Sequence, residues 1–262
     1  GDAWMSLDRE ENNKESQVAG LLSVIIPSYN YGRYIPHAIE SVIAQDYGPI
    51  EIIVIDDGST DGSQAIVQEI FDGTDRFERA SVISLEENRG KLGAINVGMQ
   101  EISGEYLIIL DADDRLDPNY VSRCVAELKA SQEQDQRIAF VYTDCHLISE
   151  GGETLDRGRS TAFDPELIKQ YSFIPEPALV LASIMHEAGP FDETIRRGTK
   201  HHKWQRIINN GWWGHHIAEP MFAYRMHGDN ISGIGRRVIG EIENGHGGER
   251  ILSGYWPTTA RV

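Results

Sequence analysis

The sequence predicts an α/β protein built on a doubly wound, mostly parallel sheet. Short runs at 21–27, 50–56 and 105–111 are apolar throughout rather than alternating, which is typical of strands covered on both faces. The segments that follow them carry apolar residues at helical spacing. With 262 residues, 40% of them hydrophobic, the chain can bury a full core in one large domain. Together these features favour strands and helices that alternate along one twisted sheet.

Strands and helices follow one another closely in the first half of the chain. The predicted strands are residues 21–27, 50–56, 80–85, 105–111 and 138–144, and the predicted helices are residues 33–46, 63–71, 91–102 and 117–131. The last helix has a strong start signal, because Asp117 can serve as N-cap and Pro118 takes the first helical position.

The pattern weakens after Asp144. A loop-rich connection is expected at 149–164, followed by a helix at 165–171, an apolar stretch at 178–184, a turn at 189–193, a helix at 200–209 and a short pair of strands at 215–227. We divide the chain into a flexible leader at 1–20, an α/β half at 21–143, a second half of the same domain at 144–232, which forms a small C-terminal lobe, and a mobile tail at 233–262.

The charge balance excludes some classes of partner. The chain has 24 Lys and Arg against 41 Asp and Glu, a net charge of −17 that would repel nucleic acid and anionic membrane surfaces. An anionic ligand would therefore need local positive charge. Two cysteines, Cys124 and Cys145, make neither a disulfide framework nor a zinc site. No apolar run approaches the ~20 residues that span a bilayer, so we expect a cytoplasmic protein, which could still act at the periphery of a membrane.

Three carboxylates stand at the end of the predicted strand 105–111, on Asp111, Asp113 and Asp114. Like charges roughly 5 Å apart repel by about 3 kcal/mol at an effective dielectric constant near 20, so the cluster needs water or a cation. In an extended chain Asp111 and Asp113 point to the same side. Mn²⁺ or Mg²⁺ binds one or two carboxylates and completes its shell with diphosphate oxygens and water.

The position of these acids in the sheet favours a metal and diphosphate site. In the usual strand order 3-2-1-4, the order reverses between the first and fourth strands, and ligands bind beyond the carboxyl ends there. Those ends are 27–30 and 111–114, and the end of the second strand, 56–61, lies beside them. Three separate polar motifs are therefore predicted to meet at one edge.

Other residues near this edge have two interpretations each. Asp56 and Asp57 could accept a hydrogen bond from a pyrimidine N–H or a ribose hydroxyl; alternatively, Asp57 or Ser59 could cap the next helix. Tyr29 could stack on a base or pack on the sheet edge. Arg89 and Lys91, at the start of the third predicted helix, could meet a phosphate or sugar, or could be solvated charges.

In order and spacing, the motifs of this chain resemble those of family-2 glycosyltransferases, which have the GT-A fold with its Rossmann-like sheet. The resemblance spans 21–232 and rests on the segments SVIIPSYNYGRYIPHAIESVIAQDY, EIIVIDDGSTDGS, NRGKLGAINVGM, GEYLIILDADDRLDP, GPFDE and EPMFAYRMHGDNIS. It implies a metal-dependent, inverting transfer of a sugar from a nucleoside diphosphate donor, most often UDP-linked, to an acceptor hydroxyl. The first half would then bind the nucleotide-sugar and the second half the acceptor.

The resemblance also assigns residues to the donor and the metal. Pro27, Tyr29 and Asp57 would hold the nucleoside, Asp111 would approach the ribose or sugar, and Asp113 would bind Mn²⁺ or Mg²⁺. The expected nucleotide-sugar site comprises Pro27, Tyr29, Asn30, Asp56, Asp57, Arg89, Lys91, Asp111 and Ala112, and the expected metal site comprises Asp113, Asp111 and His227. Without the resemblance, His227 would be taken as an ordinary loop histidine.

The sequence departs from this family where the general base is expected. Relatives usually carry an acidic pair shortly before a helical Trp, but Thr199 and Lys200 stand there before Trp204. A cationic Lys is a poor base. The histidines His202 and His201 have a suitable intrinsic pKa and are ranked first, followed by Glu193 and Asp192. Alternatively, the stretch KHHK is only a solvated helix start.

Trp212 and Trp213 could offer a platform for an acceptor sugar, or could pack in the core. The signature Gln-x-x-Arg-Trp of processive synthases and their membrane helices are not seen, which favours single-residue transfer in polysaccharide, glycolipid or glycoconjugate synthesis, to a saccharide, lipid-linked or protein-linked acceptor. Two alternatives stay open. One is a nucleotide-sugar-binding protein without transferase activity. The other is a sugar nucleotidyltransferase, although PSYNYGRY lacks the Gly-rich basic loop expected after its first strand.

Overall fold

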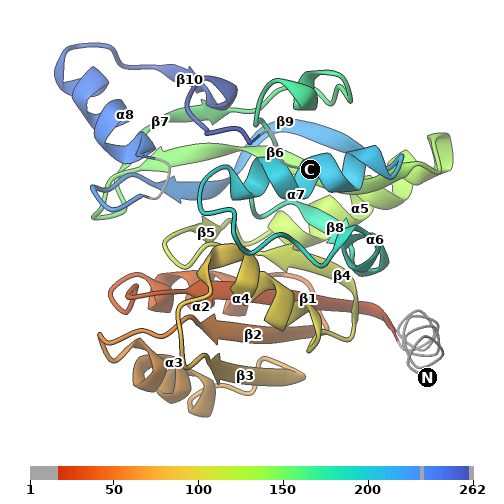
Figure 1. The fold of residues 1–262 in the computed structure, drawn as a ribbon, viewed down its shortest axis with the longest axis vertical. Helices are drawn as coiled ribbons and strands as arrows, with labels where there is room; N and C mark the ends of the chain where they lie inside the picture. Colours follow the sequence, from red (N-terminus) through yellow and green to blue (C-terminus); the bar gives the residue numbers. More distant parts are fainter. Residues whose placement is uncertain (1–16, 231–232, 260–262) are drawn as a thin grey trace.

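A computed structural model describes residues 17–230 and 233–259. Its centre is a ten-stranded sheet with the order β10-β7-β6-β8-β4-β1-β2-β3, and β9 pairs with both β5 and β6. Figure 1 shows this sheet extending from β3 at the bottom of the molecule to β7 and β10 at the top. The mixed α/β architecture and the large central sheet confirm the predicted fold class.

The four strands β1 to β4 form the parallel part of the sheet, in the predicted order 3-2-1-4. Their bounds are β1 Val18–Ser28, β2 Ile50–Asp56, β3 Arg79–Ser84 and β4 Gly104–Ile109. Every residue of β2 is buried, as expected for a strand covered on both faces. Because the strands are parallel, their carboxyl ends meet at one edge, where ligands bind in sheets of this kind.

Two layers of helices cover the sheet, and alternate residues of each central strand face one layer or the other. On β2, Ile52 and Val54 belong to one buried cluster, whereas Ile53 and Ile55 belong to the second. The first cluster includes residues of α2 Ile35–Ile43, α3 Ser63–Asp72 and α5 Tyr120–Gln134, and the second includes residues of α4 Gly90–Met99, α6 Ala182–Ala188 and α7 Thr199–Asn209. The apolar runs of the sequence are therefore buried on both sides.

The second half of the chain extends the sheet with mixed pairing. β8 is antiparallel to both β4 and β6, β7 is antiparallel to β6, and β9 is parallel to β6 and antiparallel to β5. The bounds are β5 Arg115–Leu116, β6 Ile138–Ile148, β7 Thr154–Arg159, β8 Leu179–Leu181 and β9 Trp213–Arg225. This half forms the smaller C-terminal lobe of the same sheet.

Several element predictions in the second half are corrected. The expected loop at 149–164 contains β7, and the expected strand pair at 215–227 is the single strand β9, which stays continuous because β6 and β5 pair along it. The expected helix at 165–171 is only the 3₁₀ turn η1 Leu167–Lys169.

The start of α5 is also corrected. The helix begins at Tyr120 with Asn119 as its N-cap, rather than at Asp117. The carbonyl of Asp117 instead accepts a hydrogen bond from the Tyr120 N–H at 3.0 Å, and its own N–H donates to Met221 O. The residues Asp117 and Pro118 thus form a turn that joins β5 to the helix.

The described residues near each end of the chain contain more regular secondary structure than the sequence suggests. β1 begins at Val18, so the last residues of the predicted leader belong to the sheet, and residues 1–16 lie outside the described part. Within 233–259 the expected mobile tail instead forms α8 Ile234–Glu243, β10 Glu249–Ile251 and the turn η2 Leu252–Gly254. The described part of this segment folds because Val238 and Trp256 are buried against the first cluster, which corrects the prediction.

No helix in the described ranges is long and apolar enough to cross a membrane. Cys124 and Cys145 are buried free thiols, on α5 and β6.

The central strands should carry much of the stability. Replacing Ile53→Ala removes a fully buried side chain of the second cluster, and we expect the free energy of unfolding to fall by about 3 kcal/mol in a urea titration. Val18→Ala is the control, because Val18 is 49% exposed and should change stability by less than about 0.5 kcal/mol. Equal losses for both variants would contradict this description of the core.

Candidate active site

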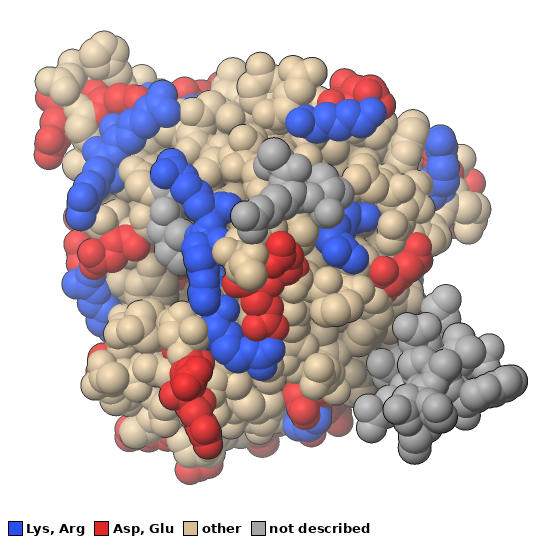
Figure 2. Space-filling model, in the orientation of Figure 1, with Lys and Arg blue, Asp and Glu red and all other residues tan. Residues whose placement is uncertain are grey.

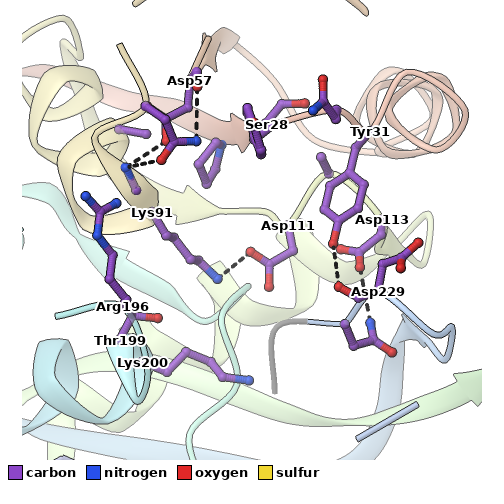
Figure 3. Close-up of a pocket in the computed structure, with 18 of the residues that line it drawn as sticks. Ser28, Tyr31, Asp57, Lys91, Asp111, Asp113, Arg196, Thr199, Lys200 and Asp229 are labelled. Carbon is purple, nitrogen blue, oxygen red and sulfur yellow. Dashed lines mark hydrogen bonds and ion pairs between the residues drawn. The ribbon is translucent and has the colours of Figure 1, made fainter. Parts of the chain in front are cut away.

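A cavity of about 550 Å³ opens at the carboxyl edge of the parallel strands. Figure 3 shows side chains from the ends of β1 and β2, from α4 and from α7 directed into it. Its lining includes Pro27, Ser28, Tyr29, Asn30, Tyr31, Arg33, Asp57, Asn88, Gly90, Lys91, Ala94, Asp111, Ala112, Asp113, Arg196, Gly198, Thr199, Lys200, Tyr224, Asp229, Asn230 and Pro257. The three motifs predicted to converge therefore line one cavity.

The loops after β1 and β2 are joined by hydrogen bonds. The Asn30 N–H donates to Ser59 Oγ at 2.9 Å, and Asn30 Oδ1 accepts from the Thr60 N–H at 2.8 Å. Asn30 has a φ of 55°, a left-handed conformation that Asn tolerates better than most residues. This turn exposes Tyr29, which is 48% accessible at the mouth of the cavity.

The carboxylates after β4 lie as close together as the sequence suggests. Asp111, Asp113 and Asp114 can each offer an oxygen within 4.8 Å of the other two. A hydrogen bond from the Asp114 N–H to Asp111 O at 3.0 Å folds the segment into a tight turn. Burial, together with the charges of Asp113 and Asp111, raises the pKa of Asp114 well above its usual range. The cluster is therefore short of positive charge.

Asp113 is held by two residues from the loop after β9. His227 Nε2 lies 2.9 Å from Asp113 Oδ2, and Asn230 Nδ2 donates to the same oxygen at 3.4 Å. His227 Nδ1 accepts a hydrogen bond from the Asp229 N–H at 3.2 Å, so Nε2 carries the proton and donates it to Asp113. Both ring nitrogens of His227 are thus engaged, and in this arrangement His227 orients Asp113.

These acids suit a hard divalent cation. Asp111 and Asp113 line the cavity, whereas Asp114 is 1% exposed and accepts a hydrogen bond from the Arg225 N–H at 3.1 Å. Two cavity-facing carboxylates and a third behind them form an all-oxygen donor set, which Mn²⁺ and Mg²⁺ prefer. The residues present therefore fit such an ion.

A chain of buried ion pairs reaches Asp111 from the second half of the protein. Lys91 Nζ lies 2.5 Å from Asp111 Oδ1 and 3.1 Å from Glu176 Oε2, and Lys203 Nζ lies 2.5 Å from Glu176 Oε1. Burial would lower the pKa of Lys91, but Asp111 and Glu176 raise it above its usual range. Lys91, predicted as a phosphate or sugar contact, thus also neutralises Asp111.

Burial would likewise raise the pKa of Glu176, but Lys203 and Lys91 lower it to about 2. The side chains of Glu176 and Lys203 are 2% and 1% exposed. Together with Lys91, this pair links α7 to α4 through the segment before β8, a contact that no pattern in the sequence indicated.

Asp57 lines the cavity and caps α4. Its Oδ1 accepts the Arg89 N–H at 2.7 Å and its Oδ2 accepts the Gly90 N–H at 2.8 Å, so Asp57 binds the start of α4 rather than the start of α3, the helix that it was expected to cap. Burial raises the pKa of Asp57, and these hydrogen bonds oppose the rise. Asp56 is buried outside the lining, where its Oδ2 accepts from Ser59 N at 3.1 Å and Gln64 Nε2 at 2.6 Å.

Arg89 and Glu193 bind each other rather than lining the cavity. The Arg89 guanidinium donates to Glu193 at 2.5 Å and 3.1 Å, and Asn96 Nδ2 donates to the same carboxylate at 3.1 Å. The hydrogen bond from the Arg89 guanidinium lowers the pKa of Glu193, and burial opposes this shift. The structure thus places the predicted base Glu193 in an ion pair beside α4, and Asp192 is likewise absent from the described lining.

His201 and His202 also lie away from the cavity, each 1% exposed within α7. His201 Nδ1 accepts the Thr259 N–H at 2.9 Å, so its Nε2 donates to Ile168 O at 2.6 Å. His202 Nε2 accepts from the Asp192 N–H at 3.4 Å, and its ring packs against Phe191. This placement argues against both as bases.

Trp212 and Trp213 lie at the opposite edge of the sheet. Trp213 pairs with Ile138 at the amino end of β6, far along the strand from the cavity residue Tyr224. The guanidinium of Arg137 stacks 3.8 Å from the Trp213 ring, and Trp212 Nε1 donates to Glu187 at 3.2 Å. Neither tryptophan is therefore among the described residues that line the cavity.

Several lining residues were not predicted, among them Tyr31, Arg196, Tyr224 and Pro257. Tyr31 donates to the Asp229 carbonyl at 3.5 Å, and burial with the charge of Asp113 raises its pKa far above its usual range. Lys200, noted only as a departure from the acidic pair, extends from α7 toward the part of the cavity that holds Asp111 (Figure 3). Figure 2 shows Lys and Arg side chains crossing the middle of this face beside acidic ones, so the net negative charge is not evenly spread.

Comparison with known proteins identifies relatives of this chain. The model of glycosyl transferase family 2 matches residues 23–144. A glycosyltransferase of Rickettsia typhi is 30% identical over 240 residues, which cover 88% of this chain and 71% of the relative. One from Nostoc sp. is 39% identical over 111 residues, 42% of this chain, and the match spans only 33% of that relative's length.

Solved structures share the fold at low identity. TarS of S. aureus in complex with UDP-GlcNAc has a TM-score of 0.62 and 19% identity, over 80% of this chain and 60% of that one. The mannosyltransferase PcManGT of Pyrobaculum calidifontis, in complex with GDP-Man and Mn²⁺, has a TM-score of 0.61 and 18% identity, over 88% and 66%. The fold is therefore the GT-A fold, as predicted.

The buried pair of Glu176 and Lys203 should be a strong determinant of stability. Glu176→Gln leaves the buried Lys203 ammonium without its anion, so we expect the free energy of unfolding at pH 7 to fall by about 3 kcal/mol. The lowered pKa of Glu176 means that its contribution is present above about pH 4.5 and is lost as the pH falls toward about 2. The difference from the parent protein in urea titrations should shrink over that range.

Glu133→Gln, on the exposed side of α5, is the matched control and should change stability little at any pH. A loss for Glu176→Gln that does not vary between pH 7 and pH 3 would contradict the ion-pair explanation.

Proposed function

Because the chain belongs to glycosyl transferase family 2, we propose that it transfers a sugar from a nucleoside diphosphate donor, UDP-linked by preference, to an acceptor. The observation that carries the proposal is that the ends of β1 and β2 and the acids after β4 line one cavity. The complexes of TarS with UDP-GlcNAc and of PcManGT with GDP-Man support a nucleotide-sugar as the class of donor.

The nucleoside would lie at the ends of β1 and β2. Pro27, Tyr29 and Asp57 line this part of the cavity, and Tyr29 is exposed enough to stack on a base. Each carboxylate oxygen of Asp57 accepts one hydrogen bond from the backbone at the start of α4. A carboxylate has about four acceptor positions, so Asp57 can still accept a hydrogen bond from a base or ribose.

The diphosphate would lie beside Asp111 and Asp113, the residues that would hold Mn²⁺ or Mg²⁺. When bound, such an ion neutralises the charge that develops on the departing diphosphate. Within the chain, Lys91 fixes one oxygen of Asp111, and His227 with Asn230 fixes Asp113. We assign His227 this positioning role rather than direct contact with the ion.

The transfer would be a single displacement with inversion at the anomeric carbon. The acceptor approaches from the face of the sugar opposite the diphosphate, and its oxygen forms the new bond as the bond to the diphosphate breaks. In this proposal residues 21–143 bind the donor and 144–232, with Pro257 from the C-terminal segment, form the acceptor side. The product would belong to a polysaccharide, glycolipid or glycoconjugate.

Asp113→Asn tests the donor site. We expect calorimetric titration of UDP in the presence of Mn²⁺ to show at least a tenfold loss of affinity, because the neutral amide removes one of the two cavity-facing charges. Release of UDP from UDP-sugars, measured with a panel of acceptors, should fall by at least a hundredfold.

Asp75→Asn, on the exposed loop after α3, is the control and should bind UDP as the parent protein does. Undiminished Mn²⁺-dependent binding by Asp113→Asn would refute the assignment of the metal site. Tight UDP binding with no transfer to any acceptor would favour a nucleotide-sugar-binding protein instead.

A further inference from the structure

Lys200 brings into the cavity a positive charge that no carboxylate of the described residues pairs. Its Nζ lies 3.6 Å from the centroid of the Trp256 ring and 5.3 Å from that of Tyr224. In the described part of the chain, no carboxylate oxygen lies within 4.0 Å of this ammonium, in contrast to Lys91 and Lys203. Aromatic faces attract a cation but do not neutralise it.

The position of Lys200 makes this charge costly. It lies in the first turn of α7, whose amino end carries partial positive charge and has no acidic residue or side-chain cap. Burial and the charge of Lys91 lower the pKa of Lys200 to about 8, which still leaves the ammonium mostly protonated at pH 7. An anionic group of a ligand would neutralise the Lys200 ammonium and would also interact favourably with the amino end of α7.

The cavity offers few groups that could remove a proton from an acceptor. Each carboxylate in its described lining already contacts a donor or a cation: Asp57 accepts from the start of α4, Asp111 pairs with Lys91, Asp113 accepts from His227, and the exposed Asp229 lies 3.5 Å from Arg33. No histidine belongs to this lining. Tyr31 stays protonated because its pKa is raised. A hydroxyl acceptor would need a base here.

We propose that the acceptor of this transferase is a phosphate monoester, held by Lys200, whose anionic oxygen attacks the anomeric carbon. The proposal rests on the transferase function above and revises the expected hydroxyl acceptor. It explains why the acceptor side of the cavity presents an ammonium rather than a base.

The reaction balances without a general base. A lone pair of the phosphate oxygen forms the bond to the anomeric carbon, the bond from that carbon to the donor diphosphate breaks, and its electron pair leaves with UDP. No proton has to be removed, since a phosphate monoester has a second pKa of about 6 and is largely dianionic at pH 7. The product is a glycosyl phosphodiester.

Binding to the full chain, loaded with UDP and Mn²⁺, tests the proposal independently of turnover. Hexyl phosphate, hexanoate and hexanol are titrated separately by calorimetry. We expect hexyl phosphate to bind at least tenfold more tightly than the other two, and Lys200→Gln to weaken it at least tenfold. Lys129→Gln, an exposed Lys of α5, is the matched control and should bind as the parent protein does.

Turnover gives a second readout. With a UDP-sugar that the protein accepts, hexyl phosphate should yield a glycosyl phosphodiester detectable by mass spectrometry, and hexanol should not react. Affinity for hexyl phosphate should fall as the pH rises through about 8, because Lys200 loses its charge. The charged groups near enough to shift the pKa of Lys200 are Lys91, which lowers it, and Asp111, Glu176 and Asp114, which raise it.

The outcomes separate this inference from the proposed function. Absence of UDP binding would overturn the transferase proposal, and this inference with it. UDP binding with equal affinity for hexyl phosphate and hexanol, or with faster transfer to hexanol, would overturn the inference alone. If Lys200→Gln weakened UDP as much as hexyl phosphate, Lys200 would serve the donor diphosphate, and a rate that rises with pH through about 8 would make it a base; either result also overturns it.

Discussion

Repulsion among the carboxylates at the carboxyl edge of the sheet is the constraint on which the rest of the site depends. Asp111, Asp113 and Asp114 lie in a partly desolvated turn, where each is stabilised by a different part of the chain. Asp111 pairs with a lysine of α4, Asp113 accepts from the loop after β9, and Asp114 accepts from the backbone of β9. Elements from both halves of the protein must therefore be in place before these acids can lie together.

The buried ion pairs extend this constraint into the second half. Lys91 and Lys203 share Glu176, so the chain of Asp111, Lys91, Glu176 and Lys203 is neutral in sum. Burying these four charges carries a desolvation penalty, and their mutual attraction offsets that penalty only if every charge is paired. These ion pairs tie α4 to α7 and thereby fix the wall from which Lys200 enters the cavity. Lys200 has no carboxylate partner among the described residues, and in our proposal its charge is the one that binds the acceptor.

The overall charge of −17 hides a local reversal of sign. The cavity receives cations from α4, from the loop before α7 and from α7, and Figure 2 shows basic side chains crossing the middle of this face next to acidic ones. An acidic protein can bind an anionic donor in this way, because interactions over a few ångströms outweigh the screened field of distant surface charges.

The sequence by itself determined the sheet and the edge of the sheet at which the proposed donor would bind. Apolar runs specify strands buried on both faces, and residues that follow parallel strands must meet at one edge, so Asp57, Asp111 and Asp113 could be placed from local pattern alone. Only the tertiary structure decided the acceptor side. Successive residues of a helix are rotated by about 100°, so Lys200 faces the cavity while the adjacent His201 is buried on Ile168. Which side of α7 faces the cavity depends on how the helix packs. That packing is set by the buried Trp204 and by the contact of Lys203 with Glu176, and no local sequence pattern specifies it.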